Sequence, residues 1–277
     1  MRTLTRIQQI ERSIQKKYRR ELWRPFIDAI KKYELINAGD RIAVCISGGK
    51  DSMLLGKLMQ ALMQHSDFPF ECEYVVMNPG YNPINLQRVM SNAALLELPV
   101  KVFDSNIFEV VTQTDRTPCY LCARMRRGFL YNEAQKLGCN KIALGHHMND
   151  VIETTLMGML FGSQFQTMMP KLKAQNFEGL ELIRPMYCVS EEAIHAWKRY
   201  NDLHFIQCAC PLSENCNVFS PGGGISKRAE VKQLIANLKQ DNKDVEKSVF
   251  NALHMVNLDA TLGYKQHGKA HSFLEHY

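Results

Sequence analysis

The chain has 277 residues, of which 45% are hydrophobic, and this size and composition suit a folded domain with its own core. No stretch approaches the roughly 18 to 20 apolar residues of a membrane helix, and the charged N-terminus does not resemble a secretory signal, so we expect a cytoplasmic protein with no membrane contact. The formal net charge of +6 favours a polyanionic partner such as RNA.

The first predicted element is a long amphipathic helix. Apolar residues recur at every third or fourth position from Ile7 to Ile30, and the turn-forming sequence INAGD at 36–40 ends the pattern. Arginine and lysine crowd this segment, which suits attraction to RNA phosphates but equally suits a solvated helix face. We expect residues 1–37 to form a helical extension, whose apolar side could pack against a second copy of the chain to give a homodimer.

After this helix the pattern changes to short, nearly continuous apolar runs separated by helical patterns. Strands buried on both faces of a parallel sheet have this composition, and their alternation with helices predicts a doubly wound α/β sheet with right-handed crossovers. We assign the sheet to residues 38–210 and a C-terminal helical segment, with two helices, to residues 211–277. The predicted strands are 41–47, 72–78, 100–105, 140–146 and 180–186, and the helical patterns between them include 54–62, 86–96 and 122–138.

The sequence SGGKDS at 47–52 stands where the first buried strand turns into a helix. In an open parallel sheet, ligands bind beyond the carboxyl ends of the strands, and a helix N-terminus there offers N–H groups and a positive dipole end to an anion. The motif lacks the longer glycine spacing of the common P-loop, so we predict a different phosphate cradle; a plain Gly-Gly turn with a capped helix is the alternative. In the cradle, Gly48 and Gly49 let the backbone approach the anion, Lys50 adds positive charge, Ser47 and Ser52 donate hydroxyl hydrogen bonds, and Asp51 faces a magnesium ion.

A second strand-to-helix turn, GHHMND at 145–150, brings more polar groups to the same edge. Asp150, opposite Asp51, could share the magnesium ion. Two adjacent histidines cannot face the same way, so at most one of them, His146 in our assignment, contacts the ligand; a structural role for the pair is the alternative. The last predicted strand, 180–186, carries Arg184 and Pro185 near its end, and the guanidinium of Arg184 could pair with a phosphate.

Five of the nine cysteines cluster in two segments. Cys119 and Cys122 lie three apart at the predicted start of a helix, where both thiols share one face and the helix N-terminus lowers the thiol pKa. The later segment contributes Cys208, Cys210 and Cys216. Four clustered thiolates would form a closed zinc site and three would hold an iron–sulfur cluster, and the spacing leaves zinc, a redox dithiol and iron–sulfur open. The other cysteines are expected to be small buried hydrophobes: Cys45, Cys72, Cys139 and Cys188.

Four segments in this order, SGGKDS, CYLCARMRRGFLY, KIALGHHMNDVIETTLMGMLFG and LIRPM, resemble the tRNA 2-thiocytidine synthetase family of tRNA-thiolating PP-loop ATP pyrophosphatases. The resemblance covers residues 35–210. It implies an enzyme that uses ATP and magnesium to adenylate a cytidine of the tRNA anticodon loop. It further implies a 4Fe-4S cluster on three cysteines, through which sulfur from a donor such as a cysteine desulfurase or free sulfide replaces the 2-oxo oxygen.

The resemblance also assigns site residues. Its cluster ligands fall on Cys119, Cys122 and Cys208, with Cys210 as the alternative third ligand. From their places in the strand-to-helix turns described above, we expect Lys50, Asp51 and Asp150 to be catalytic. ATP is expected to bind Ser47, Gly48, Gly49, Lys50, Asp51, Ser52, Gly145, His146 and Arg184.

The helix after the cysteines carries Arg124, Arg126 and Arg127, which could guide the tRNA backbone or simply pair with acidic neighbours. Two segments depart from the family pattern: MNPGYNPIN at 77–85, at the end of the second strand, and CACPLSENC at 208–216. They keep two alternatives open. One is a PP-loop enzyme that acts on another nucleotide or on a small thiolated substrate, and the other is a non-catalytic binder of nucleotide and RNA with structural zinc.

Overall fold

The computed structural model describes residues 4–113, 118–206, 226–275 and 277. The chain divides into two compact units. The sheet unit comprises Met1–Val151 and Met168–Ser226, and the C-terminal unit comprises Ile152–Thr167 and Lys227–Tyr277. Among the described residues, no helix combines the length and the apolar character needed to cross a membrane.

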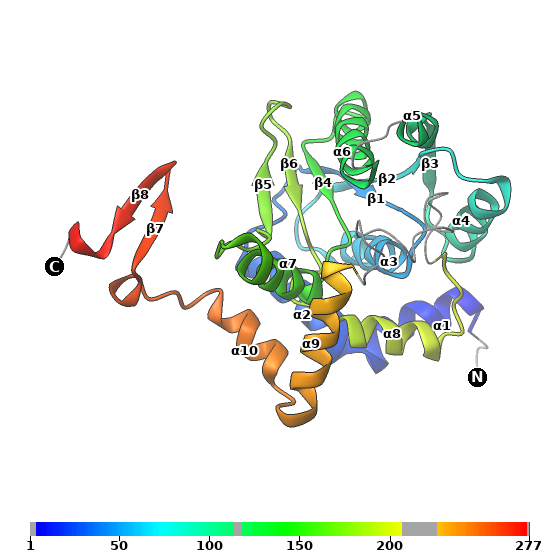
Figure 1. The fold of residues 1–277 in the computed structure, drawn as a ribbon. Coiled ribbons are helices and arrows are strands. Elements are labelled where there is room, and N and C mark those ends of the chain that lie inside the picture. The colour runs from blue at the N-terminus through cyan, green and yellow to red at the C-terminus, as the bar shows by residue number, and fades with distance from the viewer. Residues whose placement is uncertain (1–3, 114–117, 207–225, 276) are drawn as a thin grey trace. The chain divides into compact units, whose positions relative to one another are not determined.

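The sheet unit is built on six strands in the order β3-β2-β1-β4-β6-β5 (Figure 1). Neighbouring strands are parallel, except that β5 and β6 are antiparallel. The predicted parallel sheet and its five strands are confirmed. β5 is absent from the sequence prediction because it has one apolar residue, Leu172, between two lysines and so lacks a continuous apolar run. The strands are β1 (Arg41–Cys45), β2 (Glu71–Asn78), β3 (Val100–Asp104), β4 (Lys141–Ala143), β5 (Lys171–Lys173) and β6 (Glu181–Ile183).

Helices cover both faces of the sheet, as a doubly wound fold requires (Figure 1). On one face, α3 (Lys50–His65) and α4 (Pro83–Leu95) share a core with β1 and β2. On the other face, α6 (Pro118–Lys136) packs against the same strands. Consecutive residues of β1 belong to different cores, because Val44 packs with α3 and Ala43 with α6. Burial on both faces explains why the strand is continuously apolar.

Three further helices belong wholly or partly to the described sheet unit. The helix α7 (Met148–Gly162) begins close to its predicted start. Two helices are absent from the sequence prediction: α5 (Ile107–Thr112) and α8 (Glu191–Tyr200). The apolar residues of α8 have helical spacing, and Ile194 and Trp197 are fully buried in the main core. Burial of this face holds α8 against the fold.

The N-terminal segment keeps the predicted apolar stripe but is not one continuous α-helix. Two π-helical stretches, Ser13–Lys17 and Arg19–Trp23, separate α1 (Arg6–Arg12) from α2 (Arg24–Lys32). The apolar face of this segment is covered by the chain's own core, so a second copy of the chain would need a different surface. The buried residues of the stripe are Ile10, Ile14, Leu22, Phe26 and Ile30.

The C-terminal unit contains the two predicted helices, α9 (Lys227–Asp241) and α10 (Val245–Ala252). It also contains an antiparallel hairpin that the sequence prediction lacks. The hairpin turn at His267 and Gly268 has positive φ at both residues, 49° and 80°, as a two-residue turn of the primed type requires. The remaining elements described in this unit are β7 (Gly263–Gln266), β8 (Lys269–Ser272) and 3-10 helices at Leu258–Ala260 and Phe273–Glu275.

Candidate functional site

The winding of the sheet reverses between β1 and β4, the place where ligands bind in open α/β sheets. The chain leaves β1 into the loop 46–49 and leaves β4 into the loop 144–147. Because the two strands are parallel, both loops lie at the same edge, beyond the carboxyl ends. A Cβ on Gly145 would lie 3.1 Å from the carbonyl carbon of Asp51 and from the nitrogen of Ser52, so glycine lets the second loop pack directly on the first.

The first loop has the geometry of an anion cradle. Gly48 has a φ of +86°, and a Cβ there would lie 2.5 Å from Val89 Cγ2, so both conformation and space require glycine. Gly49 is the N-cap of α3 and offers no side-chain acceptor to the first N–H groups of the helix. A helix of 16 residues therefore presents these groups, and the positive end of its dipole, to the space beyond the loop.

The two serines of the motif have different surroundings. Ser52 is buried, and its hydroxyl donates to the Gly49 carbonyl at 3.0 Å. The same hydroxyl accepts from the N–H of Ser47 at 3.0 Å and from the hydroxyl of Ser47 at 3.1 Å. Ser52 therefore braces the loop from inside. Ser47 is exposed, so its hydroxyl is the one that a ligand reaches from solvent.

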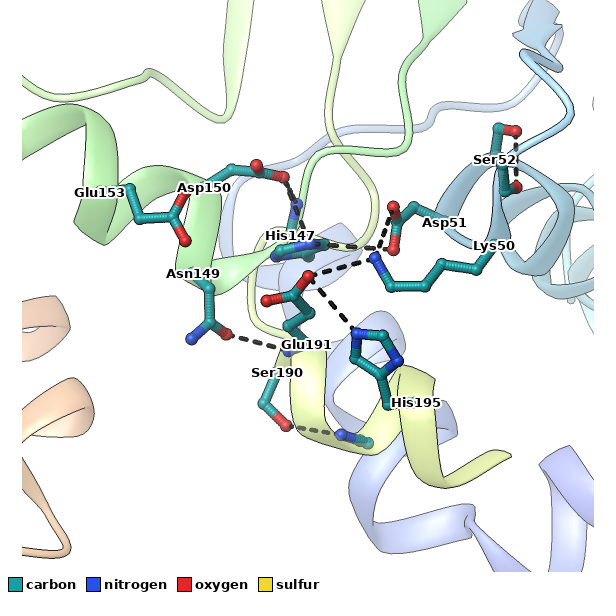
Figure 2. Close-up of polar contacts among 12 residues, drawn as sticks. Lys50, Asp51, Ser52, His147, Asn149, Asp150, Glu153, Ser190, Glu191 and His195 are labelled. Carbon is teal, nitrogen blue, oxygen red and sulfur yellow. Dashed lines mark hydrogen bonds and ion pairs between the residues drawn. The ribbon is translucent and has the colours of Figure 1, made fainter. Parts of the chain in front are cut away.

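Lys50 is held between two carboxylates (Figure 2). Its Nζ donates to Asp51 Oδ2 and to Glu191 Oε1, each at 3.1 Å. Burial alone would lower the pKa of the ammonium, but the two carboxylates outweigh burial and raise the pKa of Lys50 above its ordinary value. The first residue of α3 is therefore a positive charge at neutral pH.

Lys50, Asp51, Glu191 and His195 form a group of charged and imidazole side chains, called here the Lys50 cluster. Glu191 and His195 come from α8, and the sequence prediction omits both. Ser190 caps α8 by accepting from the N–H of Ala193, and Asn149 accepts from the N–H of Glu191 at 2.9 Å, so the start of α8 is fixed at the sheet edge. His195 Nε2 lies 3.6 Å from Glu191 Oε1, and burial, together with the neighbouring ammonium, lowers the pKa of the imidazole. The sequence SEEAIH at 190–195, with a serine N-cap and two acidic residues in the first turn, is the pattern that could have indicated this helix start.

His147 stands between the two acidic residues of the predicted site (Figure 2). Its Nε2 lies 3.8 Å from Asp51 Oδ1 and 3.5 Å from Asp150 Oδ2. Asp150 also accepts from the main-chain N–H of His147 at 3.0 Å, which orients its carboxylate at the start of α7. Asp51 Oδ1 is buried and has no hydrogen-bond partner among the described residues. This oxygen can accept a bond from a ligand or bind a cation.

His146 lines a different part of the edge from the Lys50 cluster. It borders a cavity of about 620 Å³, called here the arginine cavity. A smaller cavity, of about 260 Å³, is lined by Lys50 and by its partner Glu191. Arg184, which the sequence places on ATP, lines the arginine cavity and is not among the described residues around the smaller one. The charged, imidazole and thiol groups that line the arginine cavity are those of Cys122, Arg126, Arg127, His146 and Arg184.

One tyrosine links the phosphate loop to the helix that carries the cysteines. Tyr81 follows β2, in the segment that departs from the family pattern. Its hydroxyl donates to the Ser47 carbonyl at 3.4 Å and accepts from Arg126 Nη2 at 3.3 Å. Because α3 and α6 cover opposite faces of the sheet, their N-terminal parts can meet only at its edge. The two hydrogen bonds of Tyr81 bring them together there.

The cysteines divide into those predicted to hold a cluster and those predicted to pack as small hydrophobic residues. Cys119 lies in the first turn of α6 and Cys122 lines the arginine cavity, whereas Cys208 and Cys210 lie outside the described residues. The four cysteines expected to be small hydrophobes are buried or half-buried, and burial raises the pKa of their thiols, to about 12 in β1 and β2. These four thiols are protonated at neutral pH, which agrees with a packing role.

Comparisons with known proteins agree with this architecture. Residues 8–214 match the model of the PP-loop domain family. Relatives from Geobacter sulfurreducens and Geotalea uraniireducens, both named tRNA-cytidine(32) 2-sulfurtransferase, are 32% and 34% identical over 81% of this chain, and the matches cover 85% and 87% of the relatives. The solved structure of the U34-tRNA thiolase NcsA from Methanococcus maripaludis with its 4Fe-4S cluster matches with a TM-score of 0.64 and 19% identity, over 84% of this chain and 77% of that one. The last similarity shows a shared fold.

Proposed function

The chain belongs to the PP-loop domain family and, within it, to the tRNA-cytidine(32) 2-sulfurtransferases, and we propose on this premise that it is an ATP-dependent tRNA sulfurtransferase. It adenylates a cytidine of the anticodon loop and replaces the 2-oxo oxygen with sulfur. The observation that supports the proposal is that Tyr81 joins the loop of Lys50 to the helix of Cys119 and Cys122 at one edge of the sheet.

The loop from Ser47 to Ser52 binds the triphosphate of ATP in this proposal. The uncapped N–H groups at the start of α3 and the ammonium of Lys50 supply donors and positive charge for the phosphate oxygens. Gly145 lets the second loop pack against the first. His146, which the sequence also places on ATP, lines the arginine cavity and is not among the described residues around the Lys50 cavity.

The chemistry begins with activation, because a pyrimidine carbonyl oxygen is a poor leaving group. The cytidine O2 attacks the α-phosphorus of ATP, the bond from this phosphorus to the oxygen that bridges to the β-phosphorus breaks, and pyrophosphate leaves with the electron pair. Lys50 stabilises the charge on the departing pyrophosphate. Hydrosulfide then attacks C2, AMP departs with the former O2, and loss of the S–H proton leaves the C2=S bond.

We assign Asp51 and Asp150 to a magnesium ion. Carboxylate oxygens are the ligands that Mg²⁺ prefers, and Asp51 Oδ1 is buried without a hydrogen-bond partner among the described residues, so the donor set fits the ion. When bound, the ion neutralises charge on the phosphate oxygens of ATP. His147 separates the two carboxylates and orients Asp150 through its main-chain N–H.

We assign Cys119, Cys122 and Cys208 to a 4Fe-4S cluster, with Cys210 as the alternative third ligand. Cys119 and Cys122 lie in the first two turns of α6, three residues apart, and Cys122 lines the arginine cavity, so the donor set suits a cluster held by thiolates. When bound, the cluster would receive the sulfur, from a desulfurase or from free sulfide, that replaces the 2-oxo oxygen. The protein is proposed to act on tRNA in the cytoplasm, with a second copy of the chain as a further partner.

The test is an anaerobic reaction of the protein with ATP, sulfide and total tRNA. Thionucleosides are measured by mass spectrometry, and pyrophosphate is measured separately. Wild type should form 2-thiocytidine, and Cys122→Ala should form none while it still releases pyrophosphate, because the phosphate loop is intact. The matched control is Cys188→Ala, a half-buried cysteine outside both cavities.

Two results would contradict the proposal. Wild-type protein that contains zinc without iron, and that releases no pyrophosphate from ATP with tRNA present, would be a nucleotide and RNA binder. Pyrophosphate release with a product other than a thionucleoside would leave a PP-loop enzyme with another substrate.

A further inference from the structure

The arginine cavity gathers three guanidinium groups without a carboxylate in its described lining. Arg126 and Arg127 come from α6, and Arg184 directly follows β6. Arg184 is only 7% exposed. Burial lowers the pKa of its guanidinium and the charge of Arg127 adds to this, while neighbouring tyrosines and Asp150 offset the effect only in part. A buried cation with so little compensation is costly unless an anion joins it.

Two of these groups carry N–H donors that the described residues leave unused. The Nε atoms of Arg126 and Arg184 are both buried, and neither has a hydrogen-bond partner in the part of the chain that is described. Both groups are nevertheless held in place, because Arg184 Nη1 donates to the Met169 carbonyl and Arg126 Nη2 donates to Tyr81. Fixed guanidinium groups with unused donors suit the oxygens of a phosphate.

Much of the remaining lining is apolar or aromatic. Leu130 and Tyr131 come from α6, Leu144 follows β4, and Leu182 belongs to β6. The volume of about 620 Å³ is within the usual range of ligand pockets, roughly 300 to 1,000 Å³. A nucleobase removed from its stack binds on aromatic and apolar walls, while its phosphates need cations. One cavity offers both, and Cys122 borders it.

We propose that the arginine cavity binds the target nucleotide of the RNA, with the base on the apolar wall and the phosphodiester on the guanidinium groups of Arg126, Arg127 and Arg184. The assignment rests on the proposed sulfurtransferase function. It moves Arg184 from the phosphates of ATP, where the sequence places it, to the acceptor RNA. An enzyme that modifies a base must take it out of its stack, and a cavity that holds base and phosphate together stabilises the nucleotide in that state.

Two other anions compete for the cavity. The phosphates of ATP have their own cradle at Lys50, in the smaller cavity that Arg184 does not line. Hydrosulfide is small and needs no apolar wall. An RNA phosphodiester with its base accounts for the positive charge and for the apolar surface at once, so the cavity favours RNA.

The test measures binding of a fluorescent anticodon stem-loop to the full chain by anisotropy, at several salt concentrations. Arg127→Gln and Arg184→Lys should each weaken binding by about tenfold, because each loses a phosphate contact or its forked geometry. Arg127→Gln should also make the logarithmic salt slope shallower by about one. The control is Arg88→Gln, an exposed arginine of α4 on the opposite face of the sheet from α6, which should leave affinity unchanged.

A second RNA, which lacks the base at the target cytidine, tests the base-binding part. Wild type should bind this RNA about tenfold more weakly than the intact stem-loop, because it loses the stacking contact. In Arg184→Lys, removing the base should reduce RNA affinity by a smaller factor than in wild type, because the variant no longer holds the phosphodiester next to the cavity. A double-mutant cycle of the two proteins and the two RNAs measures this coupling.

The assignment is overturned if neither arginine variant weakens stem-loop binding or if the missing base costs nothing. A raised KM for ATP with unchanged RNA affinity would return Arg184 to ATP and also overturn it. If Arg184→Lys does not fold, Arg127→Gln carries the test, because Arg127 is exposed. Wild type that binds the stem-loop through these arginines but makes no thionucleoside would contradict the proposed function and leave the RNA site in place.

Discussion

The cavity at Lys50 and the arginine cavity lie at the same edge of one sheet, yet they balance charge in opposite ways. Lys50 is neutralised by the protein's own carboxylates, through hydrogen bonds to Asp51 and Glu191. The arginine cavity has no carboxylate in its described lining, and Arg126 and Arg184 each keep an Nε without a partner among the described residues.

The two cavities therefore differ in how much a bound anion stabilises their charged side chains. A compensated charge is stable alone, and a ligand must compete with the existing carboxylates for it. An uncompensated charge gains stability when an anion arrives. We therefore expect the Lys50 cluster to control the rate of activation, and the arginine cavity to control affinity for RNA.

The largest effect is expected at Lys50. Lys50→Met removes the ammonium that we propose to stabilise departing pyrophosphate, so pyrophosphate release should fall by about a hundredfold to a thousandfold. Stem-loop affinity should stay within about twofold of wild type, because the arginine cavity is intact. Parallel assays of pyrophosphate and anisotropy check both, with the exposed Lys247→Met as control. Equal losses of rate and RNA affinity would remove the distinction between the cavities.

A smaller effect is expected at Glu191, the partner of Lys50 that the sequence did not indicate. Glu191→Gln removes one of the two carboxylates that hold the ammonium, while the main-chain bond to Asn149 can remain. We expect kcat for pyrophosphate release to fall by about tenfold, equivalent to about 1.4 kcal/mol, with little change in RNA affinity. The matched control is its exposed neighbour, Glu192→Gln. Unchanged kcat would show that Asp51 alone positions the lysine.

Tyr81 tests whether the two cavities work together. Tyr81→Phe removes the hydroxyl that joins the Ser47 carbonyl to Arg126. The variant loses a neutral hydrogen bond to the Ser47 carbonyl and one from the charged Arg126. The amount of thionucleoside formed per pyrophosphate released should fall by about threefold, while the rate of pyrophosphate release changes less. The ratio of the two products is the measurement, and Tyr264→Phe in the hairpin of the C-terminal unit is the control. A fall in both products by the same factor would place Tyr81 in the activation site only.

The smallest effect concerns the pH dependence of the Lys50 cluster. The pKa of His195 lies below its ordinary value of 6.5, by burial and by the nearby Lys50, so the folded state binds a proton less readily than the unfolded state. The stability that this neutral imidazole contributes is present above pH 6.5 and is lost as the pH falls through the lower, folded value. Thermal unfolding of His195→Gln should therefore depend less on pH below 6.5 than wild type does. The exposed His204→Gln is the control, and equal pH dependence of wild type and His195→Gln would contradict the expectation.

Parts of the site that depend on one short segment could be predicted from the sequence. The motif at 47–52 stands between a buried strand and a helix, and the conformation of Gly48 follows from the glycine itself. The start of α6 at the Cys119 and Cys122 pair is likewise local. The roles of these residues in binding ATP, magnesium and a cluster stay predictions.

Contacts between distant segments could not be predicted in this way. Glu191 reaches Lys50 across 141 positions of the chain, and its place depends on which strand precedes α8 and on where that strand lies in the sheet. Tyr81 depends in the same way on the strand order, because it must meet both the loop after β1 and the helix α6. Hydrophobic periodicity identifies strands but does not order them.

A parallel α/β sheet and a glycine-rich turn after its first strand could be read from the sequence alone, because burial on both faces and the positive φ that glycine permits are properties of short stretches. The tertiary structure was needed to show that His147 rather than His146 lies between Asp51 and Asp150, that Lys50 is shared by two carboxylates, and that Arg184 lines the cavity of Cys122. The physical reason is that these contacts arise where strand ends from separate parts of the chain meet at one edge, and the order of the strands sets which ends meet.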